Sequence, residues 1–458
     1  MSDIKFNRRN ALKGLMALGV GSAGVGGAGG LSSLALATPE ALDRTQRFVF
    51  CYFPGAWDIL LSLDPRRMAD YPVDDMALHR IQPAYDMVEM ADASVFDAGG
   101  LQLGPYLGDS GLASHAEKLC IVRGMSMETL AHDVGRRRFI TGKPPAGLLA
   151  RGSSVATWLA ANLGIDDPIP NLAVQVESYN RDLPPAASGF RVSTAEDLVR
   201  GLSPADPAMD PALDSLLNHF HAGASSCARA RRSPVWRSGE GGRVKAREML
   251  QLDLDSLFDL NRVDPVLDAL KAEFGVFGNV RSATPEVQSL LAYQAITGGV
   301  SRCASIVVTA GLDTHFSDWA DDQGRRQRQG FDAVARLVSQ LQATRFEDTS
   351  MNWLDVTTIV CFSEFSRTPL LNAQEGRDHS LTNATMMIGG RTKPGTYGAS
   401  SNVGMEPQSV NLNTGELDRG GEIARPEHLM RELMIQAGIE EDIADLRVPG
   451  YPAAFRST

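Results

Sequence analysis

The sequence contains few cysteines, and no two of them are closely spaced. Its 458 residues include only Cys51, Cys120, Cys227, Cys303 and Cys361. An odd number of cysteines without a Cys-x-x-Cys pair excludes a disulfide framework and a zinc-knuckle pattern. All of them except Cys227 lie in or beside apolar runs, where cysteine usually behaves as a small buried hydrophobe.

Basic residues are also scarce relative to acidic ones. The chain has 44 Lys and Arg against 55 Asp and Glu, which gives a formal net charge of −11. Such a chain is a poor candidate for sequence-independent nucleic-acid binding, and general electrostatics would not hold it on anionic lipid. Hydrophobic residues make up 43% and charged residues 22%, a balance that excludes a wholly disordered chain. We therefore expect a globular protein with no nucleic-acid partner.

The N-terminus has the pattern of an export signal. Arg8 and Arg9 precede a mildly apolar stretch, residues 14–36, which ends in the small-x-small sequence at residues 35–37. A twin-arginine pair before such a stretch predicts a cleaved signal over residues 1–37, recognised by the twin-arginine (Tat) translocase. A membrane anchor is the alternative, but its glycines make the stretch weakly apolar for a spanning helix. We expect a periplasmic or secreted protein without stable membrane insertion after cleavage.

The remaining chain, residues 38–458, alternates apolar runs with helical patterns. Runs typical of buried strands occupy residues 47–53, 118–123, 171–176, 304–310, 356–362 and, more weakly, 384–388. Apolar residues recur at helical spacing over residues 153–163, 285–296, 330–341 and 426–437. This alternation predicts one α/β domain with a mostly parallel central sheet flanked by helices. Residues 181–245, rich in Pro, Ala, Ser and Arg, are expected to form an insertion or a lid.

Polar residues gather where the predicted strands end. Ligands bind beyond the carboxyl ends of the strands in such sheets, and carboxylates beside imidazoles suit zinc or manganese. The candidate ligands for one or two metal ions are Asp58, Asp313, His315, Glu364, Asp378 and His379.

Each of these residues also has a simpler interpretation. An Asp after a strand is more often a helix cap or a turn residue than a metal ligand, and for Asp58 alone that interpretation would be preferred. For Asp313 and His315 the two interpretations are balanced. The recurrence of such residues after several strands favours a shared metal site. His219 and His221 could form a metal clip, but a solvated helix face explains them better.

Four blocks of sequence resemble an exported family known as domain of unknown function 1501. They are the twin-arginine leader, residues 54–58 (Pro-Gly-Ala-Trp-Asp), residues 311–315 (Gly-Leu-Asp-Thr-His), and residues 363–369 (Ser-Glu-Phe-Ser-Arg-Thr-Pro) with the later Asp378-His379. The resemblance covers essentially the whole mature chain, and its last block is the most specific. It implies the alkaline phosphatase-like fold that the sulfatases share. It also implies the metal-ligand positions, which fall on Asp58, Asp313, His315, Glu364 and His379.

The chain departs from this resemblance at two positions. The superfamily's nucleophile is a hydroxyl or formylglycine residue that precedes a Thr-Gly pair, and Thr141-Gly142 places His132 there. His132 could be a metal ligand, a phosphohistidine-type nucleophile or a general base. Arg136 matches the sulfatase arginine, but no Cys-x-Pro-x-Arg motif is present, which argues against a formylglycine sulfatase. Phe365 stands where the family pair usually offers His or Asn, which argues against a full two-metal site.

These residues together predict a metal-dependent hydrolase. A divalent ion (zinc, manganese or calcium) held by Asp313, His315 and His379 would lower the pKa of bound water. The second group of residues, Asp58, Glu364 and His132, would hold another ion or act as base.

The expected substrate is a small ester of phosphate or sulfate, or a cell-surface polymer. Either Arg136 or Arg367 would steady its anionic group. A non-catalytic binding or assembly protein on the same fold, a retired enzyme, is the rival interpretation, because the hydroxyl nucleophile is missing. A sugar- or lipid-head-group transferase is a third possibility, although it too would need a nucleophile.

Overall fold

The computed structural model describes residues 42–144, 147, 149–204 and 210–456. The predicted export signal at residues 1–37 lies outside these residues and stays a prediction. Within the described part of the chain, no helix combines the length and apolar character needed to cross a bilayer.

An eight-stranded sheet forms the centre of the fold, in the order β12-β4-β11-β8-β1-β7-β5-β6. Seven strands run parallel, and β11 runs antiparallel to both of its neighbours. The strands are β1 (Arg47–Tyr52), β4 (Leu119–Ser126), β5 (Asn171–Val174), β6 (Phe190–Val192), β7 (Cys303–Val307), β8 (Thr357–Phe362), β11 (Thr382–Gly389) and β12 (Gly395–Tyr397). All six predicted strands are present, and the α/β class with a mostly parallel sheet is confirmed.

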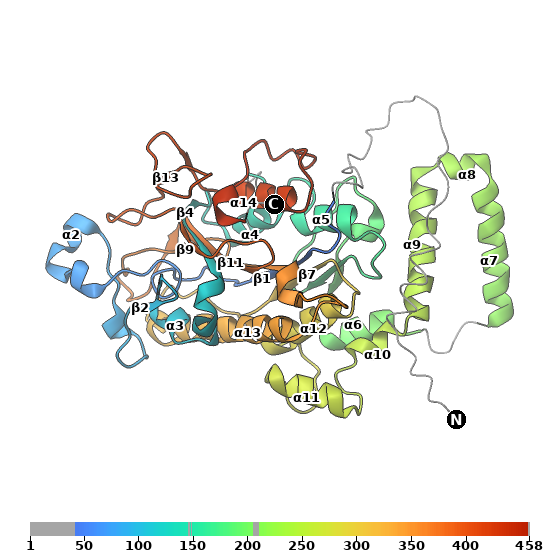
Figure 1. Ribbon diagram of the computed structural model, residues 1–458, viewed down its shortest axis with the longest axis horizontal. Helices are drawn as coiled ribbons and strands as arrows, with labels where there is room; N and C mark the ends of the chain where they lie inside the picture. The colour runs from blue at the N-terminus through green and yellow to red at the C-terminus, as the bar shows by residue number, and fades with distance from the viewer. Residues whose placement is uncertain (1–41, 145–146, 148, 205–209, 457–458) are drawn as a thin grey trace. The chain divides into compact units, whose positions relative to one another are not determined.

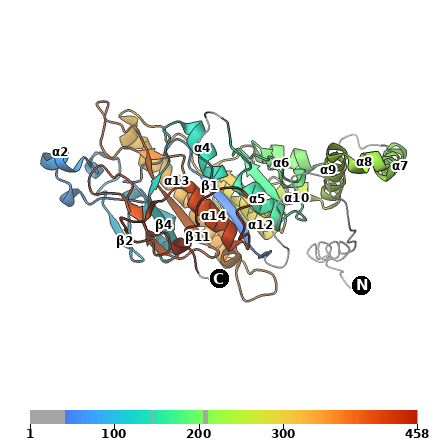
Figure 2. The ribbon, with the colours of Figure 1, turned by 90° about the horizontal axis from the view of Figure 1, so that it is seen from above.

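Helices cover both faces of this sheet (Figures 1 and 2). One face carries α4 (His132–Thr141), α5 (Val155–Leu163) and α14 (Pro426–Gln436), and the other carries α12 (Pro285–Thr297) and α13 (Gly324–Ala343). Side chains of β1 alternate between the two layers: Phe48 and Phe50 join the core under α4, α5 and α14, whereas Val49 and Cys51 join the core under α12 and α13. Burial on both faces explains why β1 reads as a continuous apolar run.

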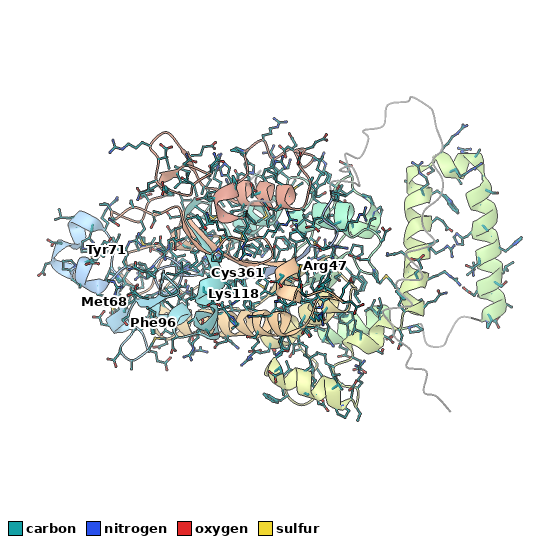
Figure 3. The ribbon with its side chains drawn as sticks, in the orientation of Figure 1. Arg47, Met68, Tyr71, Phe96, Lys118 and Cys361 are labelled. Carbon is teal, nitrogen blue, oxygen red and sulfur yellow. The ribbon has the colours of Figure 1, made fainter. Side chains whose placement is uncertain are left out.

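The cysteines follow the prediction made from their apolar surroundings. All five are free thiols, and every one except Cys227 is buried. Cys361, labelled in Figure 3, lies on β8 directly opposite Cys51 of β1. They pack as small hydrophobes in the centre of the sheet.

The segment predicted as an insertion is partly regular. Its strand β6 adds to the edge of the central sheet, so residues 190–192 belong to the fold itself and not to an insertion. Three residues are too short a run to show periodicity in the sequence. The segment continues with α6 (Ala195–Leu202), α7 (Pro211–Ser226), α8 (Ala228–Arg232) and α9 (Pro234–Gln251), followed by α10 (Leu254–Phe258) and α11 (Pro265–Glu273).

Candidate metal centre

His132 is the first residue of α4, the helix that follows β4. Ala131 precedes it and contributes no side-chain cap to the helix. Gly135, one turn further on, lies directly against the backbone of Glu364. A side chain at this position would not fit, since its Cβ would stand 2.5 Å from the carbonyl oxygen of Glu364. The missing side chain lets α4 approach the end of β8 closely, and this approach brings His132 to Glu364.

Glu364 fixes the orientation of the His132 ring. The Nδ1 of His132 lies 2.6 Å from Oε1 of Glu364. That carboxylate is 1% exposed and also accepts a hydrogen bond from the Gly55 amide at 2.8 Å, while its Oε2 lies 3.0 Å from the Ser363 hydroxyl oxygen. A carboxylate accepts the bond, so the Nδ1 carries the proton. The Nε2 of His132 is buried without a hydrogen-bond partner among the described residues, and it lies 3.3 Å from Oδ1 of Asp313.

Asp313 follows β7 and is held by the buried Arg367. The Nη2 of Arg367 donates to Oδ1 of Asp313 at 2.7 Å. The same guanidinium donates to the carbonyl oxygens of Ala56, Leu312 and Arg377 at 3.1, 2.8 and 3.1 Å. Burial opposes ionisation of Asp313, but the hydrogen bond and charge of Arg367 outweigh it and hold the pKa of Asp313 well below its usual range.

His315 and His379 complete the group around Asp313. Their Nε2 atoms lie 3.0 and 3.4 Å from Oδ1 of Asp313 and 3.0 Å from each other. The Nδ1 of His315 lies 3.0 Å from Oδ1 of Asp378, and the Nδ1 of His379 lies 2.8 Å from the carbonyl oxygen of Leu130. The short antiparallel pair β9 (Ser366–Arg367) and β10 (His379–Ser380) brings His379 beside Arg367.

Three imidazoles therefore point the same atom at one carboxylate oxygen. We call His132, Asp313, His315 and His379 the Asp313 cluster. Each Nδ1 faces an acceptor, which leaves each Nε2 with a lone pair directed into the cluster. Lone pairs that converge on a carboxylate repel one another unless a cation lies among them. Metal-ligating histidines show this pattern, in which the far ring nitrogen donates to a carboxylate or a carbonyl group.

The donor atoms of the Asp313 cluster fit a metal ion. The ligand atoms of His132, Asp313 and His379 all lie within 4.8 Å of one another. Nitrogen ligands with one carboxylate suit zinc, whereas calcium prefers oxygen ligands throughout. His315 stands beside this group, and its Nε2 lies 3.2 Å from Nη1 of Arg367.

The comparisons place the Asp313 cluster within a family. Residues 45–418 match the family described as Protein of unknown function (DUF1501). The chain belongs to this family. None of the curated proteins compared with it matches. All four residues of the Asp313 cluster lie inside the matched range.

In this DUF1501 protein, Asp58 lies outside the Asp313 cluster. It is fully buried, accepts a hydrogen bond from Trp319 Nε1 at 2.8 Å, and forms an ion pair with Arg377 at 3.0 Å. The guanidinium of Arg377 stacks over the Trp319 ring at 4.6 Å. Both oxygens of Asp58 are engaged, because Oδ1 accepts from the Leu60 amide at 2.9 Å. The structure therefore does not bring Asp58 into a site for a second ion.

The other predicted site residues of this DUF1501 protein support the cluster from outside it. Glu364 and Asp378 each contact the Nδ1 atom of a ring, so they orient the imidazoles and do not offer these oxygens to the centre. Arg136 lies one turn after His132 on α4 but pairs with Glu177 at 3.0 Å and Asp133 at 2.8 Å. Its charge is already matched by two carboxylates.

Sequence reasoning missed the role of Arg377. This arginine stands between Gly376 and Asp378, in a block singled out for its Asp-His pair, and nothing in the spacing marks it as the partner of Asp58. Its guanidinium also donates to the carbonyl oxygens of Thr368 and Pro83 at 2.8 and 3.2 Å. An arginine inside a polar block is a signal that could have been noticed, but its burial and its partner depend on the fold.

Proposed function

We propose that this DUF1501 protein is an exported, metal-dependent hydrolase of the alkaline phosphatase/sulfatase-like superfamily, acting on an ester of phosphate or sulfate. One observation carries the proposal: three imidazole Nε2 atoms, each fixed through its Nδ1, converge on Oδ1 of Asp313. This placement beyond the strand ends is the usual ligand position in an open α/β sheet.

The residues that would hold the ion are His132, Asp313 and His379, whose ligand atoms are mutually close. When bound, a divalent ion acts as a Lewis acid and makes water a nucleophile near neutral pH. Asp58 is paired with Arg377, which supports a single-ion centre over a two-ion one.

His315 is proposed as the proton acceptor. Its Nδ1 faces Asp378, so its Nε2 carries the lone pair. This Nε2 lies 3.0 Å from both Asp313 and His379 and 3.2 Å from Nη1 of Arg367. A proton taken from water would reside on this Nε2 while the Nδ1 proton stays with Asp378. Asp378 acts as the carboxylate that orients His315. The hydrogen bond to His315 is the main reason that the pKa of Asp378 lies below its usual value.

The positions of the nearby hydroxyl groups favour water as the nucleophile. Ser363, which contacts Glu364, is fully buried and donates to the carbonyl oxygen of Phe53 at 2.7 Å. Within the described chain, no serine or threonine hydroxyl has a hydrogen bond to a side chain of the Asp313 cluster. We therefore propose direct hydrolysis without a covalent intermediate.

The start of α4 supports an anionic substrate. His132 opens this ten-residue helix, and Ala131 leaves its first turn without a side-chain cap. Free amide groups at a helix N-terminus attract phosphate and sulfate oxygens. Arg136 and Arg367 already have carboxylate and carbonyl partners, so we assign them positioning roles for α4 and for Asp313.

The test combines metal analysis with an ester assay. Protein purified without chelator should contain about one equivalent of zinc and hydrolyse p-nitrophenyl phosphate or p-nitrophenyl sulfate. His379→Ala should lose metal and activity, whereas His315→Ala should keep the metal and lose roughly 100-fold in kcat. His115→Ala, distant from the cluster, is the matched control. Metal retained by His379→Ala would refute the ligand assignment.

The second candidate is a non-catalytic binding or assembly protein. It is favoured by the two buried guanidinium groups, since Arg367 and Arg377 already balance Asp313 and Asp58. Protein that takes up no metal after reconstitution and hydrolyses neither ester would support this candidate.

A further inference from the structure

Polar contacts join helices α7 and α9, which lie in the segment that begins at residue 181 and extends past residue 245. In Figure 1, α7 and α9 lie side by side and α8 joins them at one end, and Figure 3 shows side chains that project into the space between them. Arg247 binds Asp214 with two hydrogen bonds of 2.6 and 2.8 Å, and Arg243 donates to Asn218 at 3.0 Å. We call residues 211–251 the α7–α9 hairpin.

The apolar side chains of α7 lie away from this polar interface. Leu213, Leu216, Leu217 and Phe220 are 48%, 63%, 38% and 65% exposed. Their spacing of three, four and seven residues places them on one face of the helix. Asp214 and Asn218, which contact α9, occupy a different face. The hairpin therefore presents its apolar stripe outward and keeps its polar residues between the helices, which is the reverse of a helix that packs on a core.

The closed end of the hairpin is strongly basic. Arg229, Arg231 and Arg232 lie on α8, and Arg237 follows in the next turn of α9. Within the described residues, none of these four arginines has an ion pair with a carboxylate. The acidic residues Asp214 and Glu240 are paired inside the hairpin with Arg247 and Arg243. A chain with net charge −11 thus carries a locally basic end, which follows the helix that bears the exposed apolar stripe.

We propose that the α7–α9 hairpin docks this protein on the surface of an anionic lipid bilayer. An amphipathic helix with leucine and phenylalanine on one face, together with nearby arginines, lies in the plane of the membrane interface and binds anionic head groups. Each arginine near such a surface adds to binding, and the attraction acts only within about a Debye length. The overall negative charge therefore does not cancel the local effect.

Charge favours lipid over a second copy of the chain as the occupant. A symmetric contact through the α7 stripe would bury the apolar residues of both copies but would give the arginines of α8 no opposite charge. An anionic bilayer supplies the opposite charge and an apolar layer at once. The proposal goes beyond the hydrolase proposal and does not depend on it.

Cys227 makes the test direct. It is the exposed cysteine, next to α8, whereas the other four thiols are buried. The exported protein would be labelled there with an environment-sensitive fluorophore and mixed with vesicles of phosphatidylcholine alone or with about one-third phosphatidylglycerol. We expect a blue shift and co-sedimentation only with the anionic vesicles, reversed by high salt.

Two variants separate the stripe from the charge. Leu216→Ser with Phe220→Ser should abolish the blue shift. Changing Arg229, Arg231 and Arg232 to Gln should weaken partitioning roughly 100-fold and remove its salt dependence. The matched controls are Val263→Ser, another exposed apolar residue, and Arg447→Gln, another exposed arginine. The proposal is overturned if anionic vesicles do not bind the protein, if binding survives both hairpin variants, or if light scattering shows that the stripe forms a dimer instead.

Discussion

Two aspartates in this fold are both paired with buried arginines, yet their surroundings differ. Asp58 is fully buried between Arg377 and Trp319, with both oxygens engaged. Asp313 pairs with Arg367, but its side chain is 50% exposed and three imidazole nitrogens converge on it. An Asp–Arg pair is therefore not itself a functional site. The difference lies in solvent access and in the lone pairs that remain unsatisfied.

Breaking the Asp58 pair should give the largest effect on stability. Arg377→Met leaves a buried carboxylate without its cation, so we expect the free energy of unfolding to fall by about 3–5 kcal/mol. Chemical denaturation of the metal-free protein measures this loss. The double variant Arg377→Met with Asp58→Asn should recover part of it, because no unpaired charge then remains. A loss below about 1 kcal/mol in the single variant would contradict the role assigned to this pair.

The corresponding change at Asp313 should affect metal binding more than folding. Asp313→Asn removes one ligand charge, and we expect metal affinity to fall by more than about 100-fold. Asp313→Asn also leaves the buried Arg367 without its carboxylate, although its carbonyl acceptors remain. The free energy of unfolding without metal should therefore fall, but by less than in Arg377→Met, because Asp313 is half-exposed. Zinc titration and denaturation measure the two quantities. A large loss of stability with unchanged metal affinity would mean that Asp313 is a structural residue like Asp58.

Changing Glu364, the hydrogen-bond partner of His132, should lower metal affinity less than changing Asp313 itself. Glu364→Gln keeps the shape of the side chain but weakens its hydrogen bond with His132 Nδ1. We expect metal affinity to fall by about 10–100-fold. Competition with a chromogenic chelator measures the affinity. Glu177→Gln, which changes a carboxylate near α4 without contact to the imidazoles, serves as control. Equal effects of the two variants would show a general electrostatic cause.

The smallest expected effect is on the pH dependence of stability. Burial opposes protonation of His132, but its hydrogen bond to Glu364 and the charges of Glu364 and Asp313 raise its pKa. A raised folded-state pKa adds stability that is complete below the unfolded value, about 6.5, and is lost as pH rises through the folded value. In metal-free protein, the stability advantage over His132→Gln should shrink as the pH rises above about 6.5. An advantage that grows with pH would reverse the assigned shift.

The hairpin illustrates a limit of reasoning from overall composition. A net charge of −11 correctly describes the whole chain but hides the basic end formed by Arg229, Arg231 and Arg232. Their acidic neighbours along the chain are paired inside the hairpin, which only the contacts between α7 and α9 reveal.

The sequence by itself determined the class of the fold and most of the cluster. Strands such as β1 and β8 are buried on both faces, so they appear as apolar runs that need no tertiary information. Asp313, His315 and His379 stand directly after or near such runs, and parallel strands bring their carboxyl ends to one edge. The antiparallel direction of β11 and the three-residue strand β6 leave no comparable pattern, because direction and edge pairing depend on neighbours far along the chain.

Only the tertiary structure decided which carboxylates face the centre and which lie behind it. Asp58, Glu364 and Asp378 look alike in the sequence, since each follows a strand or precedes a histidine. Their roles differ because hydrogen bonds and burial are set by residues distant in the chain. Arg377 forms an ion pair with Asp58. Glu364 and Asp378 instead accept hydrogen bonds from His132 and His315. Local spacing selects the residue types, and long-range packing assigns their contacts.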